Sequence, residues 1–281
     1  MDEAYNIHEV PRLNPTTVSY TSACQPLLGR YPAFGGNRMS EPEFLDGVPS
    51  RHVLDRLAAA GGKEVESGKL LSPDSSAALA VNTFGWFVPP PRRKLLPPFP
   101  GLESAFPAEL VEVEYCARFP WAGGRHPWLD AVAITPSHLV GVESKRFEPF
   151  RGAKKPSFSE KYGKHDWGGR TDRYCRVRER LISGELRFSH LDAAQLVKHA
   201  YGLVTDAKRN GKRPALVYLF AEPARVAAGD IARHREEIAA FAGAVAGDEV
   251  SFHATSYRQW LATFPAEARD HATAVLSRFA P

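Results

Sequence analysis

Residues 128–146 read WLDAVAITPSHLVGVESKR, and this stretch decides the fold. Two short apolar runs, at 129–135 and 138–145, flank the turn-like segment TPSH. Apolar runs of this length joined by a short turn predict a β-hairpin. The first run carries Asp130 as its second residue, and the second run ends in Glu143-Ser144-Lys145. Because charged groups are costly inside an apolar sheet, their presence on two such strands needs a chemical reason.

The three charged side chains are expected to meet at one end of the hairpin. Glu143 and Lys145 are two residues apart on a strand and therefore share a face, and Asp130 can approach them from the outer end of the partner strand. Two neighbouring carboxylates need cations, of which Lys145 supplies one and a divalent metal would supply the rest. Oxygen ligands with no His or Cys nearby favour Mg²⁺ or Mn²⁺ over zinc.

An edge strand is the alternative interpretation of this pattern. Edge strands often carry charges that block aggregation, and Glu143 and Lys145 would then form a surface ion pair. The neighbouring segments VGV and AVAI are too apolar for a solvated edge, so the sequence favours a site.

The residues before the hairpin predict an arm, two helices and a connection. Residues 1–50 are rich in Pro, Gly, Ser and Asn, which predicts an irregular arm. Helices are predicted near 50–60 and over 72–86, the second with a proline in its first turn. The Pro-rich stretch 88–101 predicts a connection without regular structure.

Further strands and helices surround the hairpin. The strand predicted at 109–119 alternates, with Val111, Val113 and Tyr115 expected on one face and Glu112, Glu114 and Cys116 on the other. A helix is predicted at 190–209, where Ser189 and Asp192 resemble a capping box and Asn210-Gly211 end the helix. The elements predicted after it are a buried strand at 215–220, a helix at about 225–246, a strand near 250–255 and a closing helix.

This order of helix, three strands, helix and strand is typical of an α/β fold. Two parts are predicted: an irregular N-terminal extension with a short helix over 1–71, and one domain over 72–281. The core of that domain would span about 72–220, with a basic insertion at 146–189.

The composition fits a globular protein and excludes several classes. The chain has 281 residues, 43% of them hydrophobic, and a net charge of +4. Three cysteines lie far apart, with no spacing typical of a zinc site or a disulfide framework. No stretch approaches the length of a membrane span, and the first residues do not resemble a signal peptide, so a cytoplasmic location is expected. The chain also lacks GxSxG, HExxH and GxxxxGK[ST] motifs, which argues against other hydrolase classes.

The set Asp130 and Glu143-Ser144-Lys145 resembles the D…ExK core of the PD-(D/E)XK phosphodiesterase superfamily, the restriction-endonuclease-like nucleases. The helix SSAALAVNTFGWF and the strands EVEY and VGVESK are similar to a bacterial branch of these proteins. The resemblance covers roughly 72–220 and implies an αβββαβ core with a mixed sheet flanked by helices. Leu129 stands where the family pattern has a proline.

The resemblance also implies roles for the charged residues. Asp130 and Glu143 would bind the metal together with the backbone carbonyl of Ser144. Lys145 would orient or help to deprotonate the attacking water and stabilise the transition state. An earlier acidic residue often completes such a site, and Glu114 is the candidate, with Glu112 as the alternative.

The same resemblance implies that two helices add polar groups to the site, and each of these groups has a structural alternative. Gln195, on the predicted helix 190–209, is the best candidate for a further catalytic residue, against an ordinary polar face. His199 would contact a residue of the site without touching the substrate, or it would have a structural role alone. Asn82 resembles a polar residue of the similar proteins, and the alternative is a satisfied buried amide.

The segment after Lys145 is strongly basic. Between 146 and 189 there are 12 Lys and Arg against 6 Asp and Glu. Such a surplus favours a polyanionic partner, and aromatic rings among the cations could stack on bases. The rings are Tyr162, Trp167 and Tyr174, and they could instead pack the segment down. The candidate nucleic-acid contacts are Lys154, Lys155, Lys161, Lys164, Arg170, Arg173 and Arg176.

The sequence therefore predicts a Mg²⁺-dependent endonuclease or phosphodiesterase, with Mn²⁺ as the alternative metal. DNA ranks ahead of RNA as the substrate, and a homodimer would suit double-strand cleavage. The alternative function is a catalytically inactive nucleic-acid-binding or scaffold protein on the same fold.

Overall fold

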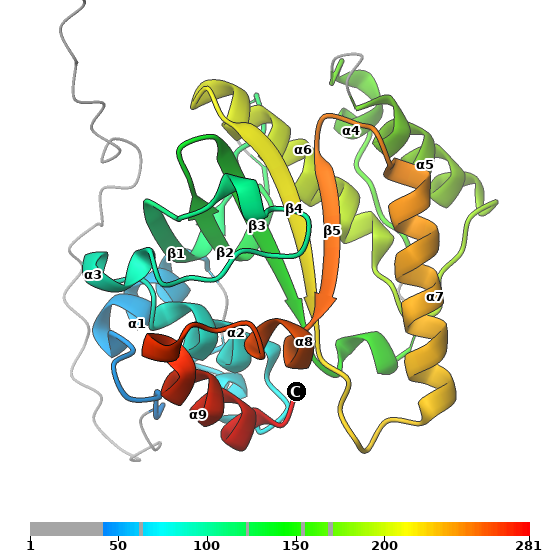
Figure 1. The fold of residues 1–281 in the computed structure, drawn as a ribbon. Coiled ribbons are helices and arrows are strands. Elements are labelled where there is room, and N and C mark those ends of the chain that lie inside the picture. Colours follow the sequence, from blue (N-terminus) through cyan, green and yellow to red (C-terminus); the bar gives the residue numbers. More distant parts are fainter. Residues whose placement is uncertain (1–41, 62–63, 122–123, 153–154, 168–170) are drawn as a thin grey trace, which may run out of the picture. The chain divides into compact units, whose positions relative to one another are not determined.

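The computed structural model describes residues 42–61, 64–121, 124–152, 155–167 and 171–281, and at its centre lies a five-stranded mixed sheet (Figure 1). The strands are β1 Leu110–Cys116, β2 Trp128–Ile134, β3 His138–Lys145, β4 Arg213–Phe220 and β5 Ser251–Ser256. They lie in the order β1-β2-β3-β4-β5, with the first three antiparallel and β3, β4 and β5 parallel.

The predicted hairpin is confirmed as β2 and β3. Ala131 pairs with Val142 and Ile134 with Leu139. Thr135 closes the turn: its N–H donates to the carbonyl of His138 at 3.0 Å, and its hydroxyl accepts the His138 N–H at 2.9 Å. The start of β2 therefore lies next to the end of β3.

Helices cover both faces of the sheet. On one face lie α1 Ser50–Ala59, α2 Ser76–Gly85, α8 Tyr257–Leu261 and α9 Arg269–Phe279; on the other lie α5 Asp172–Ser183, α6 Ala193–Arg209 and α7 Ala228–Val245. Two single turns, α3 Pro90–Arg93 and α4 Lys161–Lys164, lie in connections. Each face has its own apolar cluster, and this arrangement is the α/β class predicted, consistent with a restriction-endonuclease-like core.

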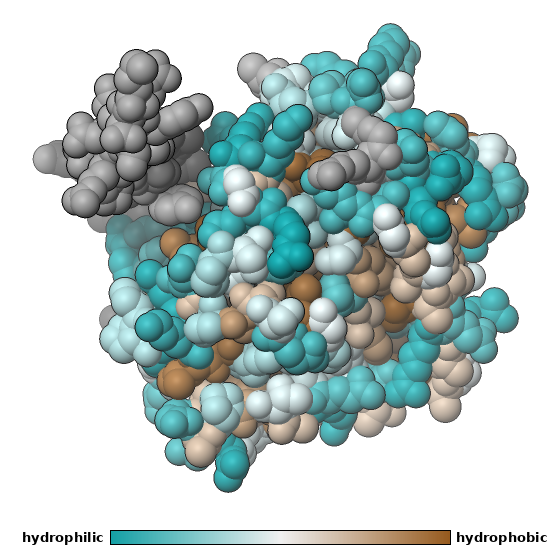
Figure 2. All heavy atoms as spheres, turned by 45° about the horizontal axis from the view of Figure 1, so that its top comes forward, coloured by the Kyte–Doolittle hydropathy of each residue, from teal (hydrophilic) through white to brown (hydrophobic). Residues whose placement is uncertain are grey.

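The sheet domain extends beyond the predicted core at both ends. Val53 and Leu57 of α1 are buried in the same apolar cluster as α2. At the other end, β5 continues the sheet beside β4. No helix among the described residues is long and apolar enough to cross a membrane. On the face in Figure 2, hydrophilic residues cover most of the surface and hydrophobic ones show in smaller patches between them.

Two glycines let α6 approach the sheet closely. A Cβ atom on Gly141 of β3 would lie 2.6 Å from Leu129 and 2.9 Å from Leu203 of α6. A Cβ atom on Gly202 of α6 would lie 2.8 Å from the Cβ of Ala117. Such distances are shorter than van der Waals contact, so larger side chains would push α6 away from β3.

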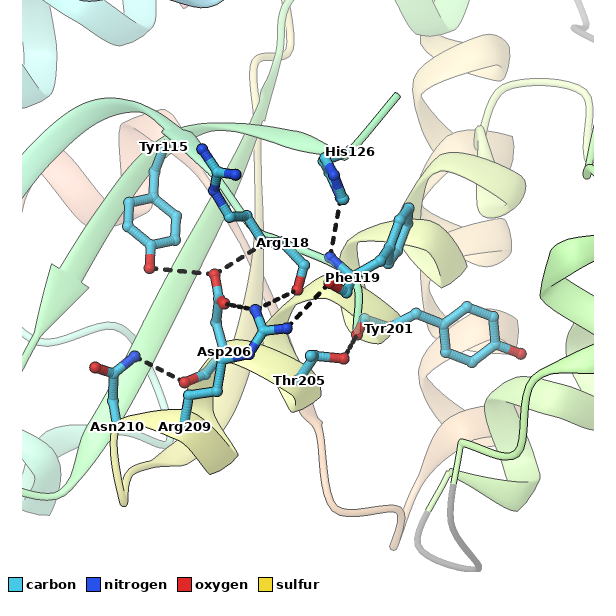
Figure 3. A network of polar contacts seen from close by, with 9 residues as sticks. All are labelled: Tyr115, Arg118, Phe119, His126, Tyr201, Thr205, Asp206, Arg209 and Asn210. Carbon is cyan, nitrogen blue, oxygen red and sulfur yellow. Dashed lines mark hydrogen bonds and ion pairs between the residues drawn. The ribbon is translucent and has the colours of Figure 1, made fainter. Parts of the chain in front are cut away.

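A polar network fastens α6 to the chain leaving β1 (Figure 3). Asp206 accepts hydrogen bonds from the Tyr115 hydroxyl at 3.3 Å and the Arg118 N–H at 3.0 Å. Arg209 pairs with Asp206 at 3.0 Å and donates to the carbonyls of Arg118 and Phe119. The network thus fixes α6 over the edge of the sheet where β2 begins.

Three details differ from the prediction. The helix expected at 72–86 begins at Ser76, because the hydroxyl of Ser75 caps it by accepting the Ala78 N–H at 3.0 Å. The connection 88–101 contains the turn α3, since Pro90 suits a first helical position. The alternation of β1 breaks at Glu114, whose φ is 51°. Tyr115 consequently faces α6 and not the side of Val113.

Candidate active site

The carboxyl end of β3 and the start of β2 bring together the three charged residues of the hairpin. The N–H of Ser144 donates to Asp130 Oδ2 at 2.6 Å. Glu143 Oε1 forms an ion pair with Lys145 Nζ. Glu143 is 2% exposed and Lys145 is 12% exposed, so this is an interior cluster and not a surface ion pair on an edge strand. Their roles in catalysis and metal binding stay predictions.

Glu143 and Lys145 hold each other in the charged state. Burial would raise the pKa of Glu143, but Lys145 and then His199 outweigh burial and bring the pKa to about 2. Burial would lower the pKa of Lys145, but Glu143 and Asp130 raise it above its ordinary value. A buried ion pair stays charged only when the attraction between its partners offsets the cost of removing both from water.

The pKa of Asp130 shifts in the opposite direction from that of Glu143. Burial and then the charge of Glu143 raise its pKa well above the ordinary value, and Lys145 and the Ser144 N–H only partly oppose this rise. Two carboxylates thus share one lysine in a buried site. A proton or a metal cation at Asp130 would relieve the repulsion.

His199 is the residue of α6 that contacts the acidic cluster. Its Nδ1 lies 3.1 Å from Glu143 Oε2, and its side chain is 3% exposed. Sequence reasoning preferred Gln195, which lies one turn earlier on the helix. The Gln195 N–H donates to the N-cap residue Asp192 at 3.0 Å, and within the described part of the chain its side chain forms no hydrogen bond with Asp130, Glu143 or Lys145. The signal available in the sequence was that His199 lies one turn from Gln195 on the same helix face.

Glu114 lies nearer the cluster than Glu112 does. Burial, then Glu64 and Glu143, raise the pKa of Glu114 to about 7, while Arg56 opposes the rise. Glu112 turns towards α1, where its Oε1 lies 2.7 Å from His52 Nε2. These contacts favour Glu114 as the additional acid, although a role in catalysis stays a prediction.

The left-handed backbone of Glu114 is held from α1. The Arg56 guanidinium donates to the carbonyl oxygens of Val113, at 3.1 Å, and Glu114. A non-glycine residue at φ 51° is uncommon, and such residues cluster at functional sites. This conformation interrupts the strand opposite Asp130, between the pairs Val113 with Ala131 and Tyr115 with Leu129.

Two other polar residues near the sheet have structural partners. The Ser144 hydroxyl lies 2.6 Å from the hydroxyl of Tyr257, which is buried beneath the sheet. Asn82 donates to the Ala78 carbonyl at 2.8 Å and accepts the Leu45 N–H at 2.7 Å. Asn82 is therefore the satisfied buried amide that the sequence left as the alternative.

The carboxylate oxygens of Asp130 and Glu143 suit a hard divalent cation, provided that one present contact of Glu143 opens. Asp130 and Glu143 would hold it, because carboxylate oxygens are the ligands that Mg²⁺ and Mn²⁺ prefer. In this structure Lys145 and His199 contact the two oxygens of Glu143. Within the described ranges no group of three or more His, Cys, Asp or Glu side chains could hold a metal ion. Metal binding at Glu143 would therefore require one of these contacts to open.

Two adjoining hollows lie at this end of the sheet. The first is lined by Lys145, Tyr218, the loop after β3 and the residues before α6. The second has a volume of about 640 Å³ and is bordered by Lys155 and Arg187. Phe188, Leu191 and Asp192 line both. The first hollow has a volume of about 20 Å³, which is room for about one water molecule, so the larger space lies in the second hollow, beside Lys155.

The other predicted basic contacts are distributed over distant places. Lys161 and Lys164 are exposed on α4, and Lys164 pairs with Glu160 at 2.6 Å. Arg173 and Arg176 are exposed on α5 and act electrostatically on Asp248, near the start of β5. Lys154 and Arg170 lie outside the described residues.

Arg173 and Arg176 lie near the start of β5, at the opposite end of the strands from the cluster of Asp130, Glu143 and Lys145. Lys145 pairs with Phe220, which pairs with Ser256 at the end of β5. Ser251, at the start of β5, is five residues away, about 16 Å along the strand at about 3.3 Å per residue. Among the predicted basic contacts that the structure describes, Lys155 is the one that lines the second hollow, which adjoins the hollow beside Lys145.

The aromatic rings of the basic segment pack inwards. Tyr162 and Tyr174 are buried, and the Trp167 ring stacks on Tyr201 of α6 with centroids 4.0 Å apart. Tyr174 donates its hydroxyl to the Val250 carbonyl at 3.2 Å. The expectation that these rings stack on bases is therefore wrong for the two buried tyrosines, and the packing alternative holds.

Comparison with known proteins gives one match. The family model described as "Restriction Endonuclease associating with ARP" matches residues 16–268. No curated protein and no solved structure matches the chain.

Proposed function

Because the chain belongs to the family described as Restriction Endonuclease associating with ARP, we propose that it is a Mg²⁺-dependent endonuclease that hydrolyses phosphodiester bonds in DNA. The observation that supports this proposal is the buried cluster of Asp130, Glu143 and Lys145 at the end of the hairpin. Maintaining two carboxylates and a lysine inside an apolar sheet destabilises the fold, which makes a functional role the better explanation.

The charge states of the residues suggest a role for each of them. Lys145 keeps its proton because its pKa is raised by Glu143 and Asp130, so it suits a cation that orients water and stabilises negative charge on the phosphoryl oxygens. Asp130 and Glu143 would bind the metal, which when bound supplies Lewis-acid stabilisation and a more acidic water. His199 acts through Glu143 and is a positioning residue.

A non-catalytic role is the second candidate. The family description speaks of association with another component, and within the described residues no three-ligand metal group is assembled. A protein of this kind would bind nucleic acid or a partner without cutting. Cleavage assays separate the two functions.

The test compares the wild type with Lys145→Met and a matched control, Lys208→Met. Lys208 is exposed on α6, nine residues after His199, which is about 14 Å along the helix. Supercoiled plasmid, linear duplex, single-stranded DNA and RNA are each incubated with Mg²⁺ or Mn²⁺. We expect metal-dependent cutting of DNA by the wild type and the control, and none by Lys145→Met. Binding of DNA by all three proteins without cutting would favour the non-catalytic role.

A further inference from the structure

Two arginines that were not predicted as nucleic-acid contacts lie at the same end of the strands as Lys145. Arg151 follows β3, and Arg225 lies in the loop after β4. Both side chains are 59% exposed, and both approach the carboxylate of Asp74. The Arg151 guanidinium lies 3.9 Å from Asp74 Oδ2, and the Arg225 guanidinium contacts Oδ1.

The positive charge at this place exceeds what Asp74 can neutralise. Arg146, which is buried, interacts electrostatically with both Asp74 and Arg225. Arg146 is fixed by hydrogen bonds to the carbonyls of Pro73 and Phe279. Three guanidinium groups therefore act on two carboxylates, those of Asp74 and Glu148, which leaves a net positive charge where an anion would be stabilised.

The exposed guanidinium of Arg225 is held in position. The Arg225 guanidinium lies over the Phe147 ring, 3.8 Å from its centroid. Cation–π contact and the ion pair with Asp74 together restrict its orientation. A guanidinium fixed in this way loses little conformational entropy when it binds a second anion, and its planar fork matches phosphate oxygens.

The patch adjoins the candidate active site. Glu148 connects them: it accepts the Arg146 N–H at 3.0 Å and interacts electrostatically with Lys145. The loop that carries Arg151 also supplies Glu148 and Gly152 to the hollow beside Lys145. In sheets with parallel strands, ligands bind at the carboxyl ends, where these loops lie.

We propose that Arg151 and Arg225 bind a backbone phosphate of DNA beside the bond that is cleaved. Asp74 holds the two guanidinium groups until the phosphate replaces it. The inference rests on the proposed nuclease function and names a substrate contact for the same site. Its ligand is a phosphodiester of a DNA strand, and inorganic phosphate is the competing source of the same chemistry.

The test measures DNA binding in the Asp130→Asn background, where cutting is not expected to interfere. Fluorescence anisotropy with a labelled duplex is recorded at several salt concentrations for the double variant Arg151→Gln/Arg225→Gln and for Asp74→Asn. Arg235→Gln is the matched control, since Arg235 is also 59% exposed and also pairs with a carboxylate, that of Glu222. Thermal unfolding of each variant shows that it is folded.

The two variants should change binding in opposite directions. We expect the double variant to bind at least about tenfold more weakly, and we expect the slope of log K against log salt to become shallower by about one, because the contact with one phosphate is removed. Asp74→Asn should bind more tightly because the arginines no longer have a competing anion. Arg235→Gln should leave affinity and slope unchanged.

Three results would overturn the inference. If the double variant binds as the control does while the Asp130→Asn protein binds DNA, the patch is not a contact, and the nuclease proposal stands. If Asp74→Asn also weakens binding, the arginine pair is structural. If inorganic phosphate at micromolar concentration binds the Asp130→Asn protein but not the double variant, while the two proteins bind DNA equally, the site binds free phosphate. Failure of every protein to bind and cut DNA would overturn both proposals.

Discussion

At the residue scale, two carboxylates of one site have opposite pKa shifts. Lys145 and His199 lower the pKa of Glu143 against burial, whereas burial and Glu143 raise that of Asp130. The pairing of Glu143 and Lys145 could be predicted from the sequence, because residues two apart on a strand share a face. The preference for His199 over Gln195 could not, because it depends on the path of α6 across the sheet. The different environments of the two acids give separate predictions.

Glu143 should make stability depend on pH in the acid range. An acid whose pKa is lower in the folded state stabilises the protein above its ordinary pKa, and the contribution is lost as pH falls through the folded value. The folded value is about 2 and the ordinary value 4.5. Urea unfolding of wild type and Glu143→Gln should therefore give a constant difference above pH 4.5 that shrinks towards pH 2. A difference independent of pH in this window would contradict the assigned charge state.

Asp130 should reduce stability near neutral pH when no metal is bound. Its pKa is raised, so its favourable protonated form is lost as pH rises through the folded value. Asp130→Asn keeps an acceptor for the Ser144 N–H and removes the repulsion with Glu143. We expect the variant to be more stable by about 1–2 kcal/mol at pH 8 without metal. Equal or lower stability in urea unfolding would mean that Asp130 is not strained by its neighbours.

At the element scale, local patterns predicted the hairpin and tertiary contacts changed the details. The apolar runs and the TPSH turn are local, and β2 and β3 form as expected. The reversal of Tyr115 is not local, because the left-handed Glu114 is held by Arg56 of α1 and Tyr115 is drawn to Asp206 of α6. The close approach of α6 to the sheet has the same origin in distant residues.

The packing of α6 gives an element-scale prediction with an internal control. Gly202→Ala would bring a methyl group within 2.8 Å of Ala117 and Pro127, so α6 should shift and stability and cleavage should both fall. A loss of about 1–3 kcal/mol is expected for such overpacking. Gly243→Ala, on α7 with nothing within 4 Å of the added Cβ, should stabilise by about 0.5–1 kcal/mol through helix propensity. Equal effects of the two substitutions in urea unfolding would contradict the tight contact.

At the scale of the whole molecule, the sequence predicted the class of fold better than the distribution of charge. The order of elements follows from periodicity, and the mixed sheet with helices on both faces agrees with it. The basic segment is continuous in sequence, but Arg173 and Arg176 lie near the start of β5 while Lys155 lines the second hollow, which adjoins the hollow beside Lys145. Arg225, far along the chain, lies with Arg151 at Asp74. Which cations lie near the site depends on the topology of the fold. A count of charges along the sequence does not reveal that topology.

The most direct test of the account is the rate at which Mn²⁺-loaded wild type and Asp130→Asn nick a supercoiled plasmid. Asn preserves the shape of the side chain and removes the charge that would bind the metal. The account predicts metal-dependent nicking by the wild type and a loss of at least about a hundredfold in the variant, as expected when a metal ligand of a catalytic site is removed. Equal nicking by both proteins, or none by the wild type under any metal, would contradict a catalytic site at Asp130, Glu143 and Lys145.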